Sequence, residues 1–286
     1  MTSLKILDYP HRIVIELTPQ CNLSCSMCPR NYIQTKDGYM SKDLWRRVID
    51  DIAKTKPDAI VLPFWRGESL LHPDFIELIQ YALNKSLRIH ISTNGNLVTG
   101  EYAKILARCE FVTFSIHTRI GYENAKNFLL LKKNDKPIAQ VSFVKGEDSE
   151  TILQAVINTS DLDGFDSVRL YEEHTKDGIF GKSGSPYKIP RIFCPKLHDT
   201  LVIAYDGSMS RCNHIWETEK EMNFHEMSIK DIWDSDCLRE IRENYPDDNC
   251  GPCDQWVGHT CGESWCLVDG EIEHKIYGEI NEVNVE

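Results

Sequence analysis

The sequence lacks any apolar run of about 18 residues, the length that a membrane-spanning helix requires. Residues 1–10 contain no basic segment followed by an apolar one, so we expect no signal peptide. Internal repeats and low-complexity segments are also missing. These absences predict a globular, cytoplasmic protein with no membrane partner.

Positive charge is scarce as well. The chain has 32 Lys and Arg residues against 44 Asp and Glu residues, which gives a formal net charge of −12. Such a chain repels a polyanion such as DNA or RNA on average. The only adjacent arginine pair, Arg46-Arg47, is expected on the solvated face of a helix. We therefore predict no nucleic-acid partner.

Cysteine, by contrast, is plentiful, with 11 residues in 286. In a cytoplasmic protein this favours metal binding over a disulfide framework. Cys21, Cys25 and Cys28 fall within eight residues, directly after an apolar run at 13–17. Their number is odd and their loop is tight, so they cannot all pair as disulfides. They can converge on one soft metal centre, and on a four-iron cluster they would leave one iron open for a substrate or cofactor.

Strand and helix patterns alternate from residue 11 to residue 170. Strands are expected at 13–17, 59–64, 88–92, 111–116, 138–144 and 167–170. Helices are expected at 41–55, 73–85, 101–109, 122–133 and 150–160, the first with Ser41 as its N-cap. Six βα units in a row predict an α/β fold with a parallel sheet, wound by right-handed crossovers into a barrel or part of one. The cysteine loop follows the first strand, at the carboxyl end where such folds carry their function.

A second block follows an irregular stretch at 171–193, which is either a domain boundary or an active-site loop. A β-hairpin is expected over 201–211, with Asp206-Gly207 as its turn, and a helix over 229–244. Four cysteines frame this block, namely Cys194, Cys212, Cys250 and Cys253. Residues 269–286 are expected to form an acidic C-terminal tail.

The cysteine triplet, in the first βα loop of such a series, resembles the cluster loop of the radical S-adenosylmethionine (radical SAM) superfamily. The segment Arg66-Gly67-Glu68-Ser69 resembles that family's Gly-Gly-Glu-type motif after the second strand, with Arg66 in place of the first glycine. The resemblance implies a partial (β/α)6 TIM barrel over residues 11–175. It also implies that Gly67 and Glu68 hold the ammonium of the cofactor's methionyl group, while Cys21, Cys25 and Cys28 bind a [4Fe–4S] cluster.

Further cofactor contacts follow from the same resemblance. It implies that Ser92, Thr93 and Asn94 meet the ribose and carboxylate of S-adenosylmethionine, that Ser115 faces the cofactor and that the backbone of Met27 touches its adenine. Two further residues have open alternatives. Arg169 would pair with the cofactor carboxylate or a substrate, or form a surface salt bridge. His117 would bond a hydroxyl or accept a proton, or serve as a structural histidine.

The second block, residues 190–268, resembles the C-terminal extension called SPASM, or its shorter relative, the twitch domain. The resemblance implies one auxiliary [4Fe–4S] cluster held by Cys194, Cys212, Cys250 and Cys253. Two further cysteines, Cys261 and Cys266, make a second auxiliary cluster an open alternative. In that arrangement Cys266 would join Cys194 and Cys212 on the first cluster, and the second, held by Cys250, Cys253 and Cys261, would be one ligand short. A zinc ribbon is the alternative for the whole block.

The chemistry implied by the resemblance is reductive cleavage of S-adenosylmethionine, with a flavodoxin- or ferredoxin-type protein as electron donor. The resulting 5′-deoxyadenosyl radical abstracts a hydrogen atom from carbon. If only one auxiliary cluster forms, Cys237, Cys261 and Cys266 are thiols that could return a hydrogen atom to a substrate radical.

We therefore expect a radical SAM enzyme, an oxidoreductase or epimerase, that acts on a hydroxylated small molecule such as an aminosugar, cyclitol or sugar derivative. Three alternatives stay open. The first is an enzyme that epimerises or cross-links a ribosomally made peptide, the second is a glycyl-radical activase, and the third is a non-catalytic zinc-binding scaffold.

Overall fold

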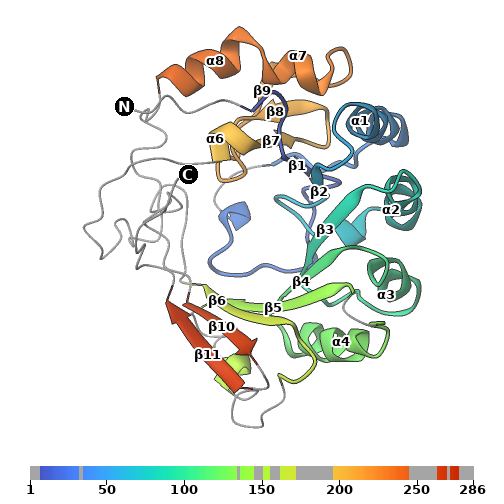
Figure 1. Cartoon of the computed structure of the whole chain (residues 1–286), viewed down its shortest axis with the longest axis vertical. Coiled ribbons are helices and arrows are strands. Elements are labelled where there is room, and N and C mark those ends of the chain that lie inside the picture. The colour runs from blue at the N-terminus through green and yellow to red at the C-terminus, as the bar shows by residue number, and fades with distance from the viewer. Residues whose placement is uncertain are drawn as a thin grey trace.

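A computed structural model describes residues 7–31, 35–133, 136–144, 151–154, 162–171, 196–244, 263–268 and 271–276. In these ranges an 11-stranded sheet has the order β11-β10-β6-β5-β4-β3-β2-β1-β7-β8-β9 (Figure 1). The strands are β1 (Arg12–Ile15), β2 (Ile60–Leu62), β3 (Arg88–Thr93), β4 (Phe111–Ser115), β5 (Ile138–Val144), β6 (Ser167–Tyr171), β7 (Thr200–Ile203), β8 (Ser208–Ser210), β9 (Glu219–Asn223), β10 (Glu263–Val268) and β11 (Glu271–Ile276).

The first six strands confirm the predicted βα series. Each of β1 to β5 pairs in parallel with the next strand in sequence. Four helices cover the outer face of the curved sheet (Figure 1), namely α1 (Lys42–Thr55), α2 (Phe75–Asn84), α3 (Gly100–Leu106) and α4 (Arg119–Leu129). Of the helix expected at 150–160, residues 151–154 are helical and the others lie outside the described residues. The α/β partial barrel is therefore confirmed.

Helix α1 shows why these segments fold where they do. The side chain of Ser41 accepts a hydrogen bond from the Leu44 N–H at 3.1 Å, which confirms the predicted N-cap. Its buried side chains recur at three- and four-residue spacing and face the sheet: Leu44, Trp45, Val48, Ile49 and Ile52. The indole N–H of Trp45 donates to the Leu78 carbonyl at 2.8 Å, which ties α1 to α2.

Two helix boundaries differ from expectation because of capping side chains. Helix α4 begins at Arg119, three residues before the expected start, since Thr118 accepts a hydrogen bond from the Gly121 N–H. The helix expected at 229–244 is two helices, α7 (Ile229–Trp233) and α8 (Asp236–Glu243). Ser235 ends the first and caps the second by accepting from the Leu238 N–H, so the chain turns between them.

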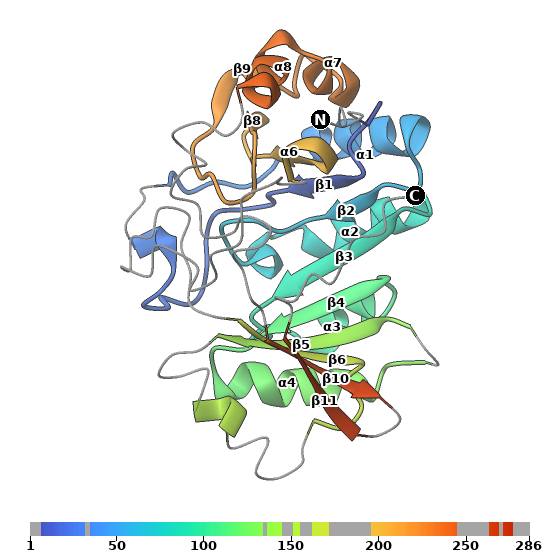
Figure 2. The same ribbon diagram turned by 60° about the vertical axis from the view of Figure 1, so that its left-hand side comes forward.

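The C-terminal block continues the barrel sheet. After the short helix α6 (Lys196–Asp199), β7 pairs in parallel with β1, and β8 and β9 follow antiparallel. The expected hairpin is confirmed as β7–β8, with Gly207 at φ +83° in its turn. Figure 2 shows β7 to β9, α7 and α8 stacked beyond the β1 edge.

The opposite edge of the sheet carries two strands that sequence patterns did not predict. Strand β10 pairs antiparallel with β6, and β11 pairs antiparallel with β10. Part of the segment expected as an acidic tail, 271–276, is therefore β-strand, and only residues 269–270 and 277–286 of it lie outside the described residues. Among the helices described, none is long and apolar enough to cross a membrane.

Candidate active site

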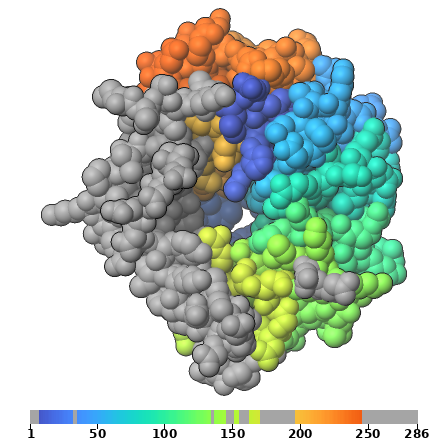
Figure 3. All heavy atoms as spheres, in the orientation of Figure 1, coloured from blue at the N-terminus to red at the C-terminus, as the bar shows by residue number. Residues whose placement is uncertain are grey.

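A cavity of about 300 Å³ opens at the carboxyl ends of β1 to β5. Figure 3 shows a narrow opening between the blue N-terminal segment and the green and yellow segments that follow. The predicted site residues that line the cavity are Cys21, Cys25, Met27, Cys28, Gly67, Glu68, Ser92, Thr93, Asn94, Ser115 and His117. They lie at the ends of β1, β2, β3 and β4 or in the loops that follow, and they meet because the parallel strands end at one edge.

The cysteine loop forms one side of the cavity. The Cys28 N–H donates to the Cys25 carbonyl at 2.9 Å, and the side-chain amide of Asn31 donates to the same carbonyl at 2.7 Å. This tight turn brings Cys28 round to the cavity. Burial raises the pKa of the Cys28 thiol, and the nearby Cys21 raises it further against the lowering effect of Arg30.

The three thiols fit a cuboidal cluster. Within the described ranges no three Cys, His, Asp or Glu side chains are placed to share one metal ion. A four-iron cluster does not need that convergence, because each thiolate binds a different iron. Cys21, Cys25 and Cys28 line one side of the same cavity instead, and their thiolates would hold the cluster there.

Glu68 fixes the neighbouring loop. Its side chain is buried, with the residue 3% exposed, and its two oxygens accept hydrogen bonds from the Thr93 hydroxyl at 3.0 Å, the Asn94 N–H at 2.8 Å and the Leu70 N–H at 3.2 Å. Burial raises the pKa of Glu68, while these bonds oppose the rise. The carboxyl group thus joins the loop after β2 to the end of β3.

Gly67 allows the loops after β1 and β2 to touch. A Cβ at this position would lie 2.4 Å from the carbonyl oxygens of Thr18 and Gln20. The next residue, Glu68, donates its backbone N–H to that Gln20 carbonyl at 2.7 Å. Only glycine permits this approach, which explains the residue type at the second position of the motif.

Asn94 connects the third strand to the cysteine loop. Its side-chain amide donates to Asn22 Oδ1 at 2.7 Å and lies 3.9 Å from Cys21 Sγ. Gly95 follows at φ +81°, a conformation that favours glycine and turns the chain after β3. The end of β4 adds a polar pair, in which Ser115 Oγ and His117 Nε2 are 3.1 Å apart. Polar groups at the ends of β3 and β4 therefore line the cavity together with the thiols.

Comparisons with known proteins match this geometry. Residues 15–142 match the model of the radical SAM superfamily, and residues 194–254 match that of the SPASM iron–sulfur cluster-binding domain. The tungsten-containing aldehyde ferredoxin oxidoreductase cofactor-modifying protein of Pyrococcus furiosus is 32% identical over 84% of this chain and 86% of its own. The chain belongs to the radical SAM superfamily.

Other similar proteins cover less of the chain or share only the fold. Mycofactocin maturase MftC of Mycobacterium tuberculosis is 32% identical over 38% of this chain and 28% of its own. The structure of BtrN in complex with AdoMet and 2-DOIA has a TM-score of 0.55 at 17% identity, covering 82% of this chain and 85% of BtrN. Streptococcus suis SuiB bound to its precursor peptide SuiA has a TM-score of 0.62 at 15% identity, covering 87% and 70%.

Membership in the family confirms the cofactors. This radical SAM enzyme uses a [4Fe–4S] cluster and S-adenosylmethionine, and its SPASM domain is an auxiliary iron–sulfur domain. Cys212, which follows β8, is the one SPASM candidate cysteine whose side chain is described. Burial raises the pKa of its thiol, and its sulfur accepts a hydrogen bond from the His214 N–H at 3.4 Å.

Several predicted residues lie elsewhere. Cys237 lies on the outer helix α8, away from the described lining of the cavity, and burial, followed by Glu219, raises its pKa. Arg169 lies on β6, between strands β5 and β10, and is also outside the described lining. Cys266 belongs to β10. The other candidate cysteines, Cys194, Cys250, Cys253 and Cys261, lie outside the described residues.

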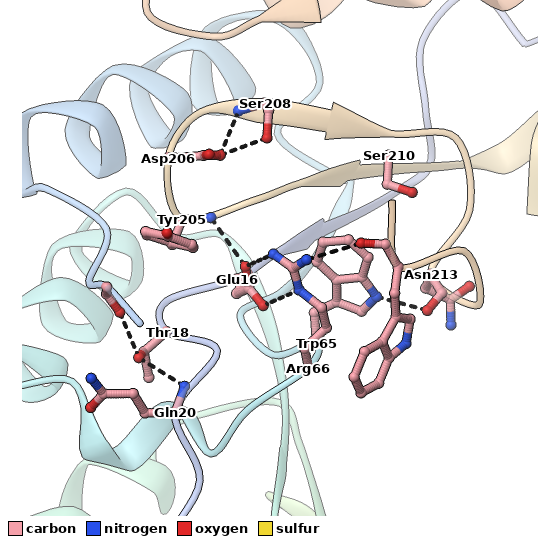
Figure 4. Close-up of polar contacts among 12 residues, drawn as sticks. Glu16, Thr18, Gln20, Trp65, Arg66, Tyr205, Asp206, Ser208, Ser210 and Asn213 are labelled. Carbon is pink, nitrogen blue, oxygen red and sulfur yellow. Dashed lines mark hydrogen bonds and ion pairs between the residues drawn. The ribbon is translucent and has the colours of Figure 1, made fainter. Parts of the chain in front are cut away.

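A buried ion pair beside the cavity was not predicted from the sequence. Glu16 is fully buried, and both its oxygens accept hydrogen bonds from the guanidinium of Arg66 (Figure 4). Two signals in the sequence point to it in retrospect. Glu16 is a charge inside an apolar strand pattern, which needs a partner when buried, and Arg66 stands where the resembled motif has glycine.

Proposed function

We propose that this radical SAM enzyme abstracts a hydrogen atom from a carbon of a hydroxylated small molecule, such as an aminosugar, cyclitol or sugar derivative, and completes an oxidation or an epimerisation. The observation that carries the proposal is the polar pair Ser115–His117, which lines the same cavity as the cysteine loop. An imidazole paired with a hydroxyl suits a substrate hydroxyl as hydrogen-bond partner.

Different loops would bind the cluster and S-adenosylmethionine. Cys21, Cys25 and Cys28 would hold the cluster, since all three line the cavity. The backbone at Gly67 and the polar groups of Ser92, Thr93, Asn94 and Ser115 would hold S-adenosylmethionine, with Met27 beside its adenine. When bound, the cluster and S-adenosylmethionine supply the radical that abstracts a hydrogen atom, and an auxiliary cluster supplies a one-electron acceptor.

His117 carries the proton in the oxidation. Conversion of an alcohol to a ketone removes a hydrogen atom from carbon, a proton from oxygen and one electron. His117, held beside Ser115 at 3.1 Å, would take the hydroxyl proton, because imidazole titrates near neutral pH. In the epimerisation a thiol of Cys261 or Cys266 would return a hydrogen atom to the substrate radical instead. The thiyl radical left behind would regain the thiol by taking one electron from the proposed electron-donor protein and a proton from solvent.

A second candidate is modification of a small organic cofactor of another enzyme. The near-full-length relative in Pyrococcus furiosus is named as a cofactor-modifying protein of a tungsten-containing aldehyde ferredoxin oxidoreductase. That similarity spans both the barrel and the C-terminal block, whereas the similarity to the MftC maturase spans 38% of the chain. It favours a small molecule over a peptide. A flavodoxin or ferredoxin is the proposed electron donor in either case.

Deuterium transfer tests the proposal. The anaerobically reconstituted, reduced enzyme is incubated with S-adenosylmethionine and candidate sugars, cyclitols or organic cofactors deuterated at carbon. Deuterium in 5′-deoxyadenosine identifies the substrate class, and solvent deuterium in the product separates epimerisation from oxidation. Transfer from a peptide alone would refute the small-molecule proposal.

A further inference from the structure

Arg66 makes more contacts than an ion pair needs. Its Nε donates to Glu16 Oε1 at 2.7 Å and its Nη2 to Glu16 Oε2 at 2.5 Å, which is the strong bidentate geometry. The third nitrogen, Nη1, donates to the Trp216 carbonyl at 3.0 Å. The guanidinium also stacks on the Trp65 ring, with Cζ 4.1 Å from the ring centre. Glu16 and Arg66 are 0% and 8% exposed as side chains, so water is largely excluded.

These contacts reach the chain on both sides of Cys212. Before it, the Tyr205 N–H donates to Glu16 Oε2 at 3.3 Å. After it, the indole N–H of Trp65 donates to the Asn213 carbonyl at 2.7 Å, and Arg66 holds the Trp216 carbonyl. Figure 4 shows Glu16, Arg66 and Trp65 lying together between the loop at Tyr205 and the loop at Asn213. Residues 150 positions apart in sequence are thus joined by a single side chain.

The Cys212 loop is itself tightly folded. The Ser210 hydroxyl donates to the Ile215 carbonyl at 2.7 Å, and the Ile215 N–H donates to the Cys212 carbonyl at 3.0 Å. These bonds close the loop on itself. Trp65 and Arg66 attach it to the barrel, because both of these residues also line the cavity. A loop that loses this attachment should open, and its amides should exchange, more readily.

We propose that Arg66 is a positioning residue that, with Glu16 and Trp65, fastens the Cys212 loop to the wall of the S-adenosylmethionine cavity. The residue takes no part in the chemistry. It sets where the auxiliary cluster ligand stands relative to the cavity. The assignment of Cys212 to a cluster rests on the proposed function, whereas the fastening of the loop does not.

Hydrogen exchange on the metal-free full-length chain tests the fastening alone. The reporters are the amides of His214 and Ile215, which are bonded to Cys212. Arg66→Met keeps the aliphatic stem and removes all three donors, and Arg66→Lys keeps the charge. The matched control is Arg88→Met, which removes another bidentate Arg–Glu pair, to Glu110, without touching this loop.

We expect both amides to exchange at least about tenfold faster in Arg66→Met than in wild type, with a smaller change in Arg66→Lys and none in Arg88→Met. Should Arg66→Met fail to fold, Glu16→Gln/Arg66→Met removes the unpaired buried charge and gives the same comparison. Exchange within about twofold of wild type in the folded variants would overturn the proposal.

Iron release from the reconstituted enzyme tests the consequence for the cluster. The rate of iron loss to a chelator is followed in each variant, and Cys212→Ala identifies the C-terminal phase. That phase should accelerate at least about tenfold in Arg66→Met but not in Arg88→Met. Equal acceleration of every phase would overturn the positioning role. Absence of 5′-deoxyadenosine formation would refute the proposed function and leave the exchange result standing.

Discussion

The loop after β2 is joined to its two neighbours in different ways. Toward the third strand, the buried carboxyl of Glu68 accepts three hydrogen bonds from neutral donors. On its other side, Arg66 of this loop pairs with buried Glu16, which follows β1, and the pair reaches the C-terminal block through the Trp216 carbonyl and the Tyr205 N–H. The neutral junction joins only the ends of two neighbouring parallel strands. The charged junction also reaches a distant segment, and its planar bidentate geometry fixes the orientation of the guanidinium that donates to Trp216.

The largest expected effect, on 5′-deoxyadenosine formation, distinguishes the cavity cysteines from Cys212 of the C-terminal block. Replacing Cys21, Cys25 and Cys28 together by Ala should abolish 5′-deoxyadenosine formation, because the cavity would then lack its thiolate ligands. Cys212→Ala should retain 5′-deoxyadenosine formation and lose about four irons per chain. Both are measured by product chromatography and iron content after anaerobic reconstitution. Formation of 5′-deoxyadenosine by the triple variant would contradict the cavity assignment.

Breaking the charged junction should have the next largest effect. Glu16→Gln leaves the Arg66 guanidinium buried without a counter-charge, which should lower the free energy of unfolding by about 3–5 kcal/mol. The double variant Glu16→Gln/Arg66→Met should lose less than the sum of the single variants, because no charge remains buried. Denaturant unfolding of the metal-free chain measures this.

The control for that cycle is the exposed pair Arg88–Glu110, whose side chains are 40% and 26% exposed. Arg88→Met should cost at most about 1 kcal/mol, since water screens the pair. Equal costs at Arg88 and Glu16 would show that burial does not distinguish the two ion pairs.

Breaking the neutral junction should cost less than breaking the charged one. Glu68→Gln replaces one acceptor oxygen by an amide that faces the donors of Thr93, Asn94 or Leu70. One buried donor then lacks a partner, which should lower the free energy of unfolding by about 1–3 kcal/mol. The same denaturant experiment measures it. A loss larger than that of Glu16→Gln would reverse the proposed order of the two junctions.

Some features of the fold and of the site can be predicted from the sequence, and others cannot. The βα series, Ser41 as N-cap, the β7–β8 hairpin and the cavity loops all follow from local patterns, because periodicity and turn residues act over a few positions. The parallel strands then bring the loop residues Gly67, Asn94 and Ser115, which the family resemblance singled out, to one edge. The fold is therefore predictable from short-range signals, and the resemblance adds which loop residues line the cavity.

Other features depend on pairing between distant segments. Nothing local in 200–203 indicates that β7 adds to β1, nor in 271–276 that a strand forms beside β10. Likewise the partner of Glu16 lies 50 residues away. A single sequence shows that a buried charge needs a partner and does not show which one.

The smallest expected effect concerns thiol reactivity, which compares Cys28 of the cavity with Cys212 of the C-terminal block without any substitution. Burial is the main cause that raises the pKa of both Cys28 and Cys212, so less thiolate is present at a given pH than in a free thiol. Below its pKa, each thiol of the metal-free chain should react with iodoacetamide about tenfold faster per pH unit.

Cys109 is the internal control, since it is 3% exposed and burial raises its pKa to about 12. It should stay unmodified at neutral pH until the chain unfolds, as peptide mass spectrometry would show. Rates at Cys28 and Cys212 that no longer rise above pH ~8 would contradict the raised pKa values, because the thiolate would then already be fully formed.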